Sequence, residues 1–156
     1  MGALTGTIKD AVDEMREAGQ KIGVVTLKCF RPFPFAAVRE ALRHVSRVLV
    51  IERMMSAGGA GAVSLEVMKA LKGTAVDQKT VYAGLGGRSV SKASFKKVFG
   101  AALRNEMQED EFFLDLDREL LSRQLEREKT SRHIGPLPEA LNRHVNERKL
   151  ARGEEI

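Results

Sequence analysis

The chain alternates between stretches in which apolar residues return every three or four positions and short runs in which they are nearly continuous. Apolar residues at helical spacing over 8–18 predict an amphipathic helix. Thr7 and Asp10 suit the start of this helix, and Gly19 suits its end. The run "IGVVTL" at 22–27 is rich in β-branched side chains and predicts a strand that is covered on both faces.

The same two patterns recur further along the chain. Continuous apolar runs predict strands at 48–52 and 80–84, and apolar stripes predict helices around 35–42, 63–71 and 95–103. Ser91 is placed to cap the last of these helices. Buried strands that alternate with helices predict an α/β fold of three layers, with a mostly parallel sheet and helices on both faces.

One strand is missing from this pattern. The chain opens on a helix, whereas a doubly wound unit ordinarily has a strand before its first helix, and three strands make a thin sheet. We therefore expect that the chain is a fragment or that a partner supplies the strand.

Charge divides the chain into two parts. Residues 1–104 carry 17 Lys and Arg against 8 Asp and Glu, whereas residues 105–156 carry 9 against 13. The second part keeps apolar anchors at 112–116 and 120–125 and a weak helical pattern around 141–145, after a break at Gly135. We predict an α/β domain over 1–104 and a partly helical tail over 105–156 that packs on a partner subunit.

Composition excludes several classes of protein. A single cysteine, Cys29, allows neither an internal disulfide nor a thiolate-bound cluster. The sequence contains neither an apolar run of the ~20 residues that cross a bilayer nor a secretory leader, so we expect a cytoplasmic protein without membrane contact. Dispersed basic residues, one tyrosine and no tryptophan favour a protein partner over a nucleic acid.

The corner "FRPFPF" is the first candidate site, because it joins a predicted strand to a helix at the edge of the sheet where ligands bind in open α/β folds. Two prolines stiffen the backbone around Arg31 and Phe33, so Arg31 is presented to a carboxylate or phosphate. The alternative is that the phenylalanines fix the corner to the core and to a subunit boundary while Arg31 binds nearby carbonyl groups.

Two glycine-rich turns follow at the same edge. The turn with Gly58, Gly59 and Gly61 lacks the third glycine of a dinucleotide fingerprint and the Lys of a phosphate loop, so close helix packing explains it better than a ligand. The turn with Gly86, Gly87 and Arg88 permits positive φ, and Arg88 would form either a basic rim with Arg31 or a salt link to a neighbouring subunit.

No catalytic group is indicated. The residues His44, His133 and His144 lack metal-ligand spacing, and Cys29 has no neighbouring histidine. We therefore predict no catalytic, cofactor-binding or metal-binding residue in this chain, and leave Arg31, Phe33, Gly86, Gly87 and Arg88 as possible ligand or subunit contacts.

Three separate stretches resemble one known family. The start "MGALTGTIKDAVDE", the corner "FRPFP" and the turn "GLGGR" occur in the order found in 2-oxoacid:ferredoxin oxidoreductases, of which the pyruvate:ferredoxin oxidoreductase (pyruvate synthase) group is most similar. The resemblance covers about residues 1–104 and is to the second, transketolase C-terminal-like domain of the alpha subunit.

This resemblance implies a non-catalytic assembly domain in a complex that decarboxylates a 2-oxoacid to acyl-CoA and reduces ferredoxin. The complex is expected to use thiamine diphosphate, Mg²⁺, [4Fe–4S] clusters and CoA, all held outside this chain. The implied partners are the rest of an alpha chain and the beta, gamma and ferredoxin-like delta subunits. A stand-alone adaptor or small-ligand module is the alternative, and a nucleic-acid-binding protein ranks last.

Overall fold

The structure is a computed structural model of the chain, and it describes residues 2–56 and 60–130. Five α-helices, three strands and one short 3₁₀-helix occur in this part of the chain. In chain order they are α1 (Thr5–Glu17), α2 (Phe35–Leu42), β1 (Arg47–Glu52), α3 (Ala62–Leu71), β2 (Asp77–Tyr82), η1 (Leu85–Gly87), α4 (Lys92–Leu103), β3 (Glu111–Phe113) and α5 (Arg118–Thr130).

The three strands form one parallel sheet in the order β1-β2-β3. Arg47 lies opposite Asp77 at the start of the β1–β2 pair, and Glu52 lies opposite Tyr82 at its end. The short strand β3 pairs only with the end of β2, and the rings of Tyr82 and Phe113 stack there with centroids 4.9 Å apart.

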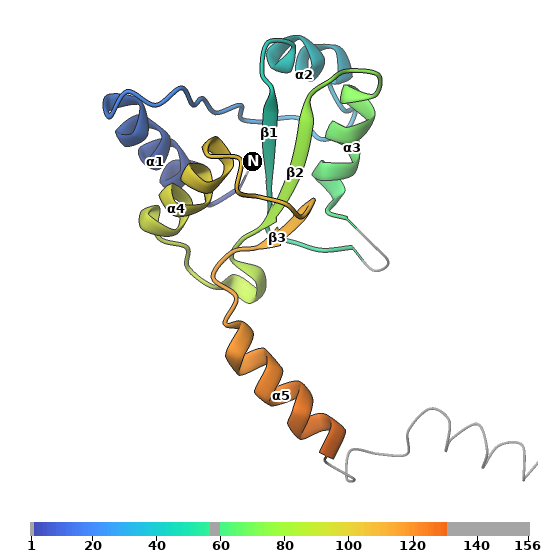
Figure 1. Cartoon of the computed structure of the whole chain (residues 1–156). Helices are drawn as coiled ribbons and strands as arrows, with labels where there is room; N and C mark the ends of the chain where they lie inside the picture. The colour runs from blue at the N-terminus through green and yellow to red at the C-terminus, as the bar shows by residue number, and fades with distance from the viewer. Residues whose placement is uncertain (1, 57–59, 131–156) are drawn as a thin grey trace, which may run out of the picture. The chain divides into compact units, whose positions relative to one another are not determined.

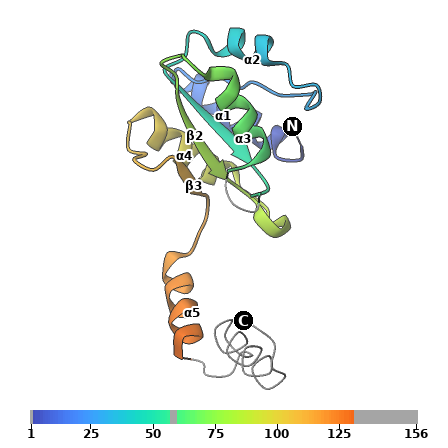
Figure 2. The same cartoon turned by 90° about the vertical axis from the view of Figure 1, so that its right-hand side faces the viewer.

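Two hydrophobic clusters cover the two faces of the sheet. One cluster joins α1 and α4 to β2, and Phe95 at its centre is fully buried and stacks on Phe99. The other joins α2 and α3 to β1 through Val50. Figure 1 shows α1 and α4 on one side of the strands and α3 on the other, and Figure 2 views the sheet from the α3 side. The predicted fold class, a three-layer α/β domain with a parallel sheet, is confirmed.

The prediction of a strand at 22–27 is wrong for this structure. These residues form no helix or strand, and two of their side chains are largely exposed, Val24 at 40% and Val25 at 51%. A β-branched run forms a strand only when a neighbouring strand accepts its hydrogen bonds, and no described strand lies against this one. The sequence pattern was that of a strand, but its pairing partner is absent from the described sheet.

The end of the domain lies further along the chain than the charge pattern suggested. The first compact unit runs over Met1–Leu116, so residues 105–116, which the sequence assigned to the tail, belong to it. They contribute β3 and the buried side chain of Met107. The cause is local: Phe112 and Leu114 pack on the α1–α4 cluster, which charge counting does not detect.

The second unit, Asp117–Ile156, contains α5 among the described residues. The carboxylate of Asp117 accepts a hydrogen bond from the backbone N–H of Leu120 at 2.9 Å and caps the start of this helix. Leu120, Leu121 and Leu125 are exposed on it. The helical pattern around 141–145 lies outside the described residues. Among the described helices, none combines the length and apolar character needed to cross a bilayer.

Glu14 provides a pH-dependent link between α1 and α4. Its carboxylate accepts hydrogen bonds from Lys92 Nζ at 2.6 Å and Lys96 Nζ at 3.0 Å, and these bonds lower the pKa of Glu14 below its ordinary value of 4.5. A carboxyl group whose pKa is lowered by folding stabilises the fold above its ordinary pKa, and this contribution is lost as the pH falls through the lower, folded-state value. We therefore expect Glu14→Gln to weaken the loss of stability with acidification below pH 4.5.

Urea unfolding from neutral pH into the acid range measures this effect. Glu17→Gln is the matched control, because it removes a carboxylate from the same helix and leaves the Glu14–Lys92–Lys96 contact intact. Parallel loss of stability in wild type and Glu14→Gln would show that this link does not contribute.

Candidate functional site

The candidate site is the edge of the sheet at which the parallel strands end. Open α/β sheets bind ligands at this edge, because the loops and helix N-termini that follow the strands meet there. In this chain β1 ends at Glu52 and β2 ends at Tyr82, and each strand is followed by a glycine-containing turn. The groups that occupy this edge decide whether a ligand can bind.

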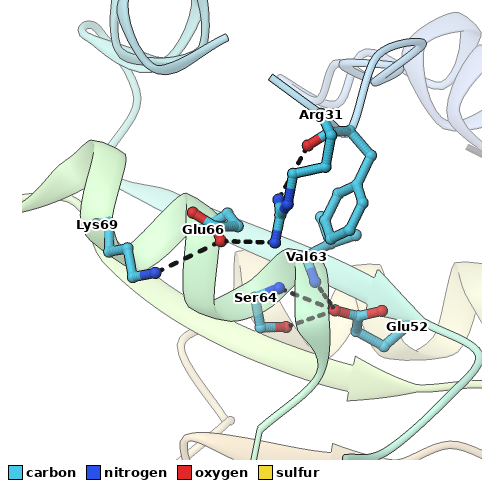
Figure 3. A network of polar contacts seen from close by, with 7 residues as sticks. Arg31, Glu52, Val63, Ser64, Glu66 and Lys69 are labelled. Carbon is cyan, nitrogen blue, oxygen red and sulfur yellow. Dashed lines mark hydrogen bonds and ion pairs between the residues drawn. The ribbon is translucent and has the colours of Figure 1, made fainter. Parts of the chain in front are cut away.

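Glu52 occupies the N-terminus of α3. Its Oε1 accepts hydrogen bonds from the backbone N–H of Val63 at 2.7 Å and of Ser64 at 2.8 Å, and from the Ser64 hydroxyl at 3.3 Å (Figure 3). Glu52 and Ser64 are both buried. A carboxylate from β1 therefore accepts hydrogen bonds from N–H groups that have no partner within the helix. Its negative charge also compensates the positive end of the α3 dipole.

Gly61 makes this contact possible. A Cβ atom on Gly61 would lie 2.4 Å from three side-chain atoms of Glu52, far inside van der Waals contact. Glycine at position 61 thus allows the turn to lie close to the Glu52 side chain. The sequence interpretation of this turn as packing agrees with the position of Gly61, while Gly58 and Gly59 lie outside the described residues.

Arg31 fastens the Pro-containing corner to α3. Its guanidinium donates from Nη1 to the Phe30 carbonyl oxygen at 2.9 Å and from Nη2 to Glu66 Oε1 at 3.1 Å (Figure 3). It also lies 4.0 Å from the centroid of the Phe30 ring. Lys69 Nζ lies 3.4 Å from the same Glu66 oxygen. The two cations share one carboxylate, whose side chain is 11% exposed while that of Arg31 is 61% exposed.

Phe33 is a core residue in this structure. It is 7% exposed and belongs to the α2–α3 cluster, where its ring lies 5.0 Å from that of Phe35. The exposed member of the pair is Phe35. Phe33 thus anchors the corner, and Phe35 is the aromatic side chain that remains accessible to a partner.

The third turn carries Gly86, Gly87 and Arg88. Gly86 and Gly87 have φ of +66° and +82°, as the sequence suggested, and a third glycine, Gly84, has φ of +68°. The side chain of Arg53, directly after β1, donates to the Gly84 carbonyl oxygen at 3.4 Å. Arg88 is exposed, and its role in a basic rim with Arg31 or in a salt link to a neighbouring subunit stays a prediction.

The resemblance places the cofactors outside this chain, and each cofactor needs particular groups that can be compared with the described residues. A helix N-terminus can bind a phosphate through free N–H donors, but the N–H groups of Val63 and Ser64 at the start of α3 are bonded to Glu52. An iron–sulfur cluster needs several thiolates, and the sequence has one cysteine, whose Sγ lies 3.3 Å from the Pro32 carbonyl oxygen. Among the described residues, no three His, Cys, Asp or Glu side chains gather as metal ligands.

Sequence reasoning missed the two acidic residues that organise this edge. Glu52 was detectable in principle, because it is the one charged residue at the end of an apolar strand and precedes a glycine-rich turn. Glu66 carries no such signal, since its pairing with Arg31 spans 35 positions and depends on how α3 packs.

These observations define an α/β domain in which Glu52 and Glu66 engage the N-terminus of α3 and the Pro-containing corner at one edge of the sheet. The family model described as "Pyruvate:ferredoxin oxidoreductase core domain II" matches residues 1–95, more than half of the chain. The chain therefore belongs to this domain family, as its resemblance indicated.

Curated relatives come from several oxidoreductases. The pyruvate synthase subunit PorA of Methanosarcina barkeri is 34% identical over 131 residues, which is 78% of this chain and 32% of that protein. The ketoisovalerate oxidoreductase subunit VorA of Pyrococcus horikoshii is 37% identical over 100 residues, 63% of this chain and 25% of that protein. The alpha subunit of the NADH-dependent phenylglyoxylate dehydrogenase of Aromatoleum evansii is 53% identical over 53 residues, 34% of this chain and 13% of that protein. The chain thus spans at most about a third of these relatives.

The Gly61–Glu52 contact can be tested by adding a single methyl group. Gly61→Ala should lower the free energy of unfolding by about 1–3 kcal/mol, because the new Cβ forces the buried Glu52 carboxylate away from the N–H groups that it caps. Chemical denaturation measures the change.

Gly6→Ala is the control, because Gly6 lies in α1, has ordinary φ and has no atom within 4 Å of its Cβ position. This exchange should leave stability unchanged or raised, since alanine favours a helix over glycine. Equal stability of Gly61→Ala and wild type would contradict the close packing of this turn.

Proposed function

We propose that this chain is a non-catalytic assembly domain of a thiamine-diphosphate-dependent 2-oxoacid:ferredoxin oxidoreductase alpha subunit. The complex would convert a pyruvate-like 2-oxoacid to acyl-CoA and reduce ferredoxin. Membership of the domain family and the names of the relatives support the class of enzyme. The proposal that the chain itself does no chemistry rests on one observation, the Glu52 carboxylate at the N-terminus of α3.

The physical argument follows from charge. The N-terminus of α3 is a position at which an α/β fold can hold a phosphate, and it already holds the buried Glu52 carboxylate. A second anion would be repelled by Glu52 and would find its N–H donors occupied. The domain therefore uses this anion-binding position for its own stability, which suits a scaffold.

The relatives are named for different 2-oxoacids, which favours a role for this domain that does not include selection of the substrate. They refer to pyruvate, ketoisovalerate and phenylglyoxylate, which differ in the size and shape of the group beside the 2-oxo carboxylate. A domain that recurs in proteins named for different 2-oxoacids is unsuited to discriminate between them. We infer that selection of the 2-oxoacid belongs to other parts of the complex.

Arg31, Phe33, Gly86, Gly87 and Arg88 remain proposed contacts of this domain. For Arg31 and Phe33 we propose a positioning role, because Glu66 and the α2–α3 cluster already engage them. Arg88 is exposed, and no ion-pair partner is described for it, so we propose that it forms a salt link to a neighbouring subunit. Gly86 and Gly87 would present Arg88 by supplying the left-handed backbone of the turn.

Purification through a tag on the full chain, from cells that express its candidate companion subunits, tests this function. We expect the eluate to contain bound thiamine diphosphate and iron and to reduce ferredoxin when a 2-oxoacid and CoA are added. The chain purified alone should show none of these properties. Turnover by the chain alone, or an eluate without companions, would contradict the proposal.

The same purification with Arg31→Ala tests the role of Arg31. The Arg31 side chain is 61% exposed, and Glu66 keeps Lys69 Nζ at 3.4 Å when Arg31 is removed, so the variant should fold. Weaker assembly is expected from a positioning role. A raised KM for CoA or the 2-oxoacid with assembly intact would instead show direct ligand contact.

A further inference from the structure

Helix α3 is apolar on two opposite sides. Towards the sheet it buries Val67, Ala70 and Leu71. On the other side Leu65 is 42% exposed and Met68 is 55% exposed. In Figure 1 α3 lies on the side of the sheet away from α1 and α4, and no described element of the first unit lies beyond it. A helix that is apolar on both sides is typical of a buried helix, so the outward side of α3 has the composition of a contact surface.

Helix α1 is the contrasting case in the same domain. Its exposed residues are Gly6 and five charged residues, while its apolar stripe is directed into the core. This is the ordinary pattern of a helix whose outer side meets water. The outward apolar residues of α3 are therefore not a general property of the helices in this domain.

Two lysines share the outward side of α3 with its apolar residues. Positions 65, 68, 69 and 72 are separated by steps of three and four, so their side chains are neighbours on the surface of the helix. All four side chains are exposed. Leu65, Met68, Lys69 and Lys72 together are called the α3 outer face.

Positive charge on and beside the α3 outer face is largely uncompensated. Glu66 Oε1 is shared between Lys69 Nζ at 3.4 Å and Arg31 Nη2 at 3.1 Å. Among the described residues, the Lys72 ammonium group has no ion-pair partner. Arg39 donates from Nη2 to the Lys72 carbonyl oxygen at 2.8 Å, and no carboxylate pairs with it in the described part of the chain. Four cations therefore share one carboxylate, which leaves a surplus of three positive charges.

A second copy of the chain offers no complementary surface on its described helices. The complement of the α3 outer face needs exposed apolar side chains together with an excess of Asp and Glu. Helix α5 has exposed leucines, but it carries four basic residues against three acidic ones. Helix α1 has two basic against four acidic residues, but it exposes no large apolar side chain. Helix α2 is neutral, and α4 carries three lysines and no acidic residue. The complement is therefore expected on another polypeptide.

We propose that the α3 outer face docks an acidic amphipathic helix of a companion polypeptide in the oxidoreductase complex. This inference rests on the proposed function, because the occupant is a chain of that complex. Leu65 and Met68 pack against the apolar stripe of the docked helix. Asp and Glu side chains beside that stripe pair with the cations that have no carboxylate of their own, Lys72 and Arg39.

The surface of α3 sets the pattern of its occupant. Packed helices interlock rows of side chains spaced three or four residues apart, with their axes about 8–10 Å apart. The occupant therefore carries aliphatic residues at this spacing and carboxylates on the flanks of the stripe. Because the pairing is between charges near solvent, the affinity should fall as the concentration of NaCl is raised.

Two variants of opposite charge at position 68 test the occupant. Met68→Glu and Met68→Lys both remove an exposed methionine and leave the contacts of Glu66 in place, so both variants should fold. Met68→Glu should lower the recovery of companion polypeptides through a tag on the full chain at least tenfold relative to Met68→Lys, because a carboxylate repels an acidic helix and an ammonium group attracts it. Each variant is the control for the other, since both lose the same apolar side chain.

Each result decides the inference. Equal loss of companions with the two variants, or a larger loss with Met68→Lys, overturns an acidic occupant. Recovery equal to wild type with both variants overturns docking at the α3 outer face and leaves the proposed function standing. Failure of the wild-type chain to recover any companion overturns both.

Acetylation of lysine side chains, read by mass spectrometry, tests the same surface without a variant. The wild-type chain is labelled alone and in the complex purified through it, and Lys97, which is exposed on α4, gives the reference rate in each sample. Relative to Lys97, Lys72 should react at least tenfold more slowly in the complex than in the chain alone. An unchanged relative rate overturns the inference, and this measurement decides should Met68→Glu not fold. Protection of Lys72 in the chain alone, together with a dimer mass in native mass spectrometry, overturns the companion and assigns the surface to a second copy.

Discussion

The buried contact between Glu52 and the N-terminus of α3 is the interaction on which the arrangement of this domain depends. It joins the end of β1 to the start of α3 through one carboxylate oxygen and two backbone N–H groups. Hydrogen bonds to a charged acceptor are stronger than neutral ones, and burial reduces competition from water. The contact also requires Gly61, because any side chain there would overlap Glu52.

This contact occupies a helix N-terminus of the kind that binds anions in other α/β folds. Parallel α/β sheets place helix N-termini together at one edge, and catalytic members of such folds use them to bind anions. Here the α3 terminus binds an internal anion, and the neighbouring corner is held by the pairing of Arg31 with Glu66. The edge is therefore stabilised in one arrangement before any partner arrives. Such a surface suits contact between subunits, where rigid backbone and exposed side chains such as Phe35 meet a partner.

The sequence predicted those parts of the fold that depend on local pattern. The stripes of α1 to α4, the cap at Ser91 and the strands β1 and β2 all follow from spacing and side-chain type; Ser94 donates its backbone N–H to Ser91 Oγ at 3.0 Å, as expected. Phe33 was a candidate for a ligand or subunit contact and lies in the core. Prolines in the sequence indicate a rigid corner, but they do not indicate which way its side chains point. The strand predicted at 22–27 does not form in this structure, because strand formation depends on a neighbouring strand. The sequence did not predict β3, because three residues are too few for a periodic signal. The roles of Glu52 and Glu66 are tertiary and needed the structure.

Isothermal titration of the full chain with inorganic pyrophosphate and thiamine diphosphate tests the role of Glu52 most directly. With its carboxylate at the α3 N-terminus, the chain should show no saturable heat, corresponding to a Kd weaker than about 1 mM for both compounds. Saturable binding of one equivalent in the micromolar range would show that the helix N-terminus is open to a phosphate and that the domain carries a cofactor site of its own.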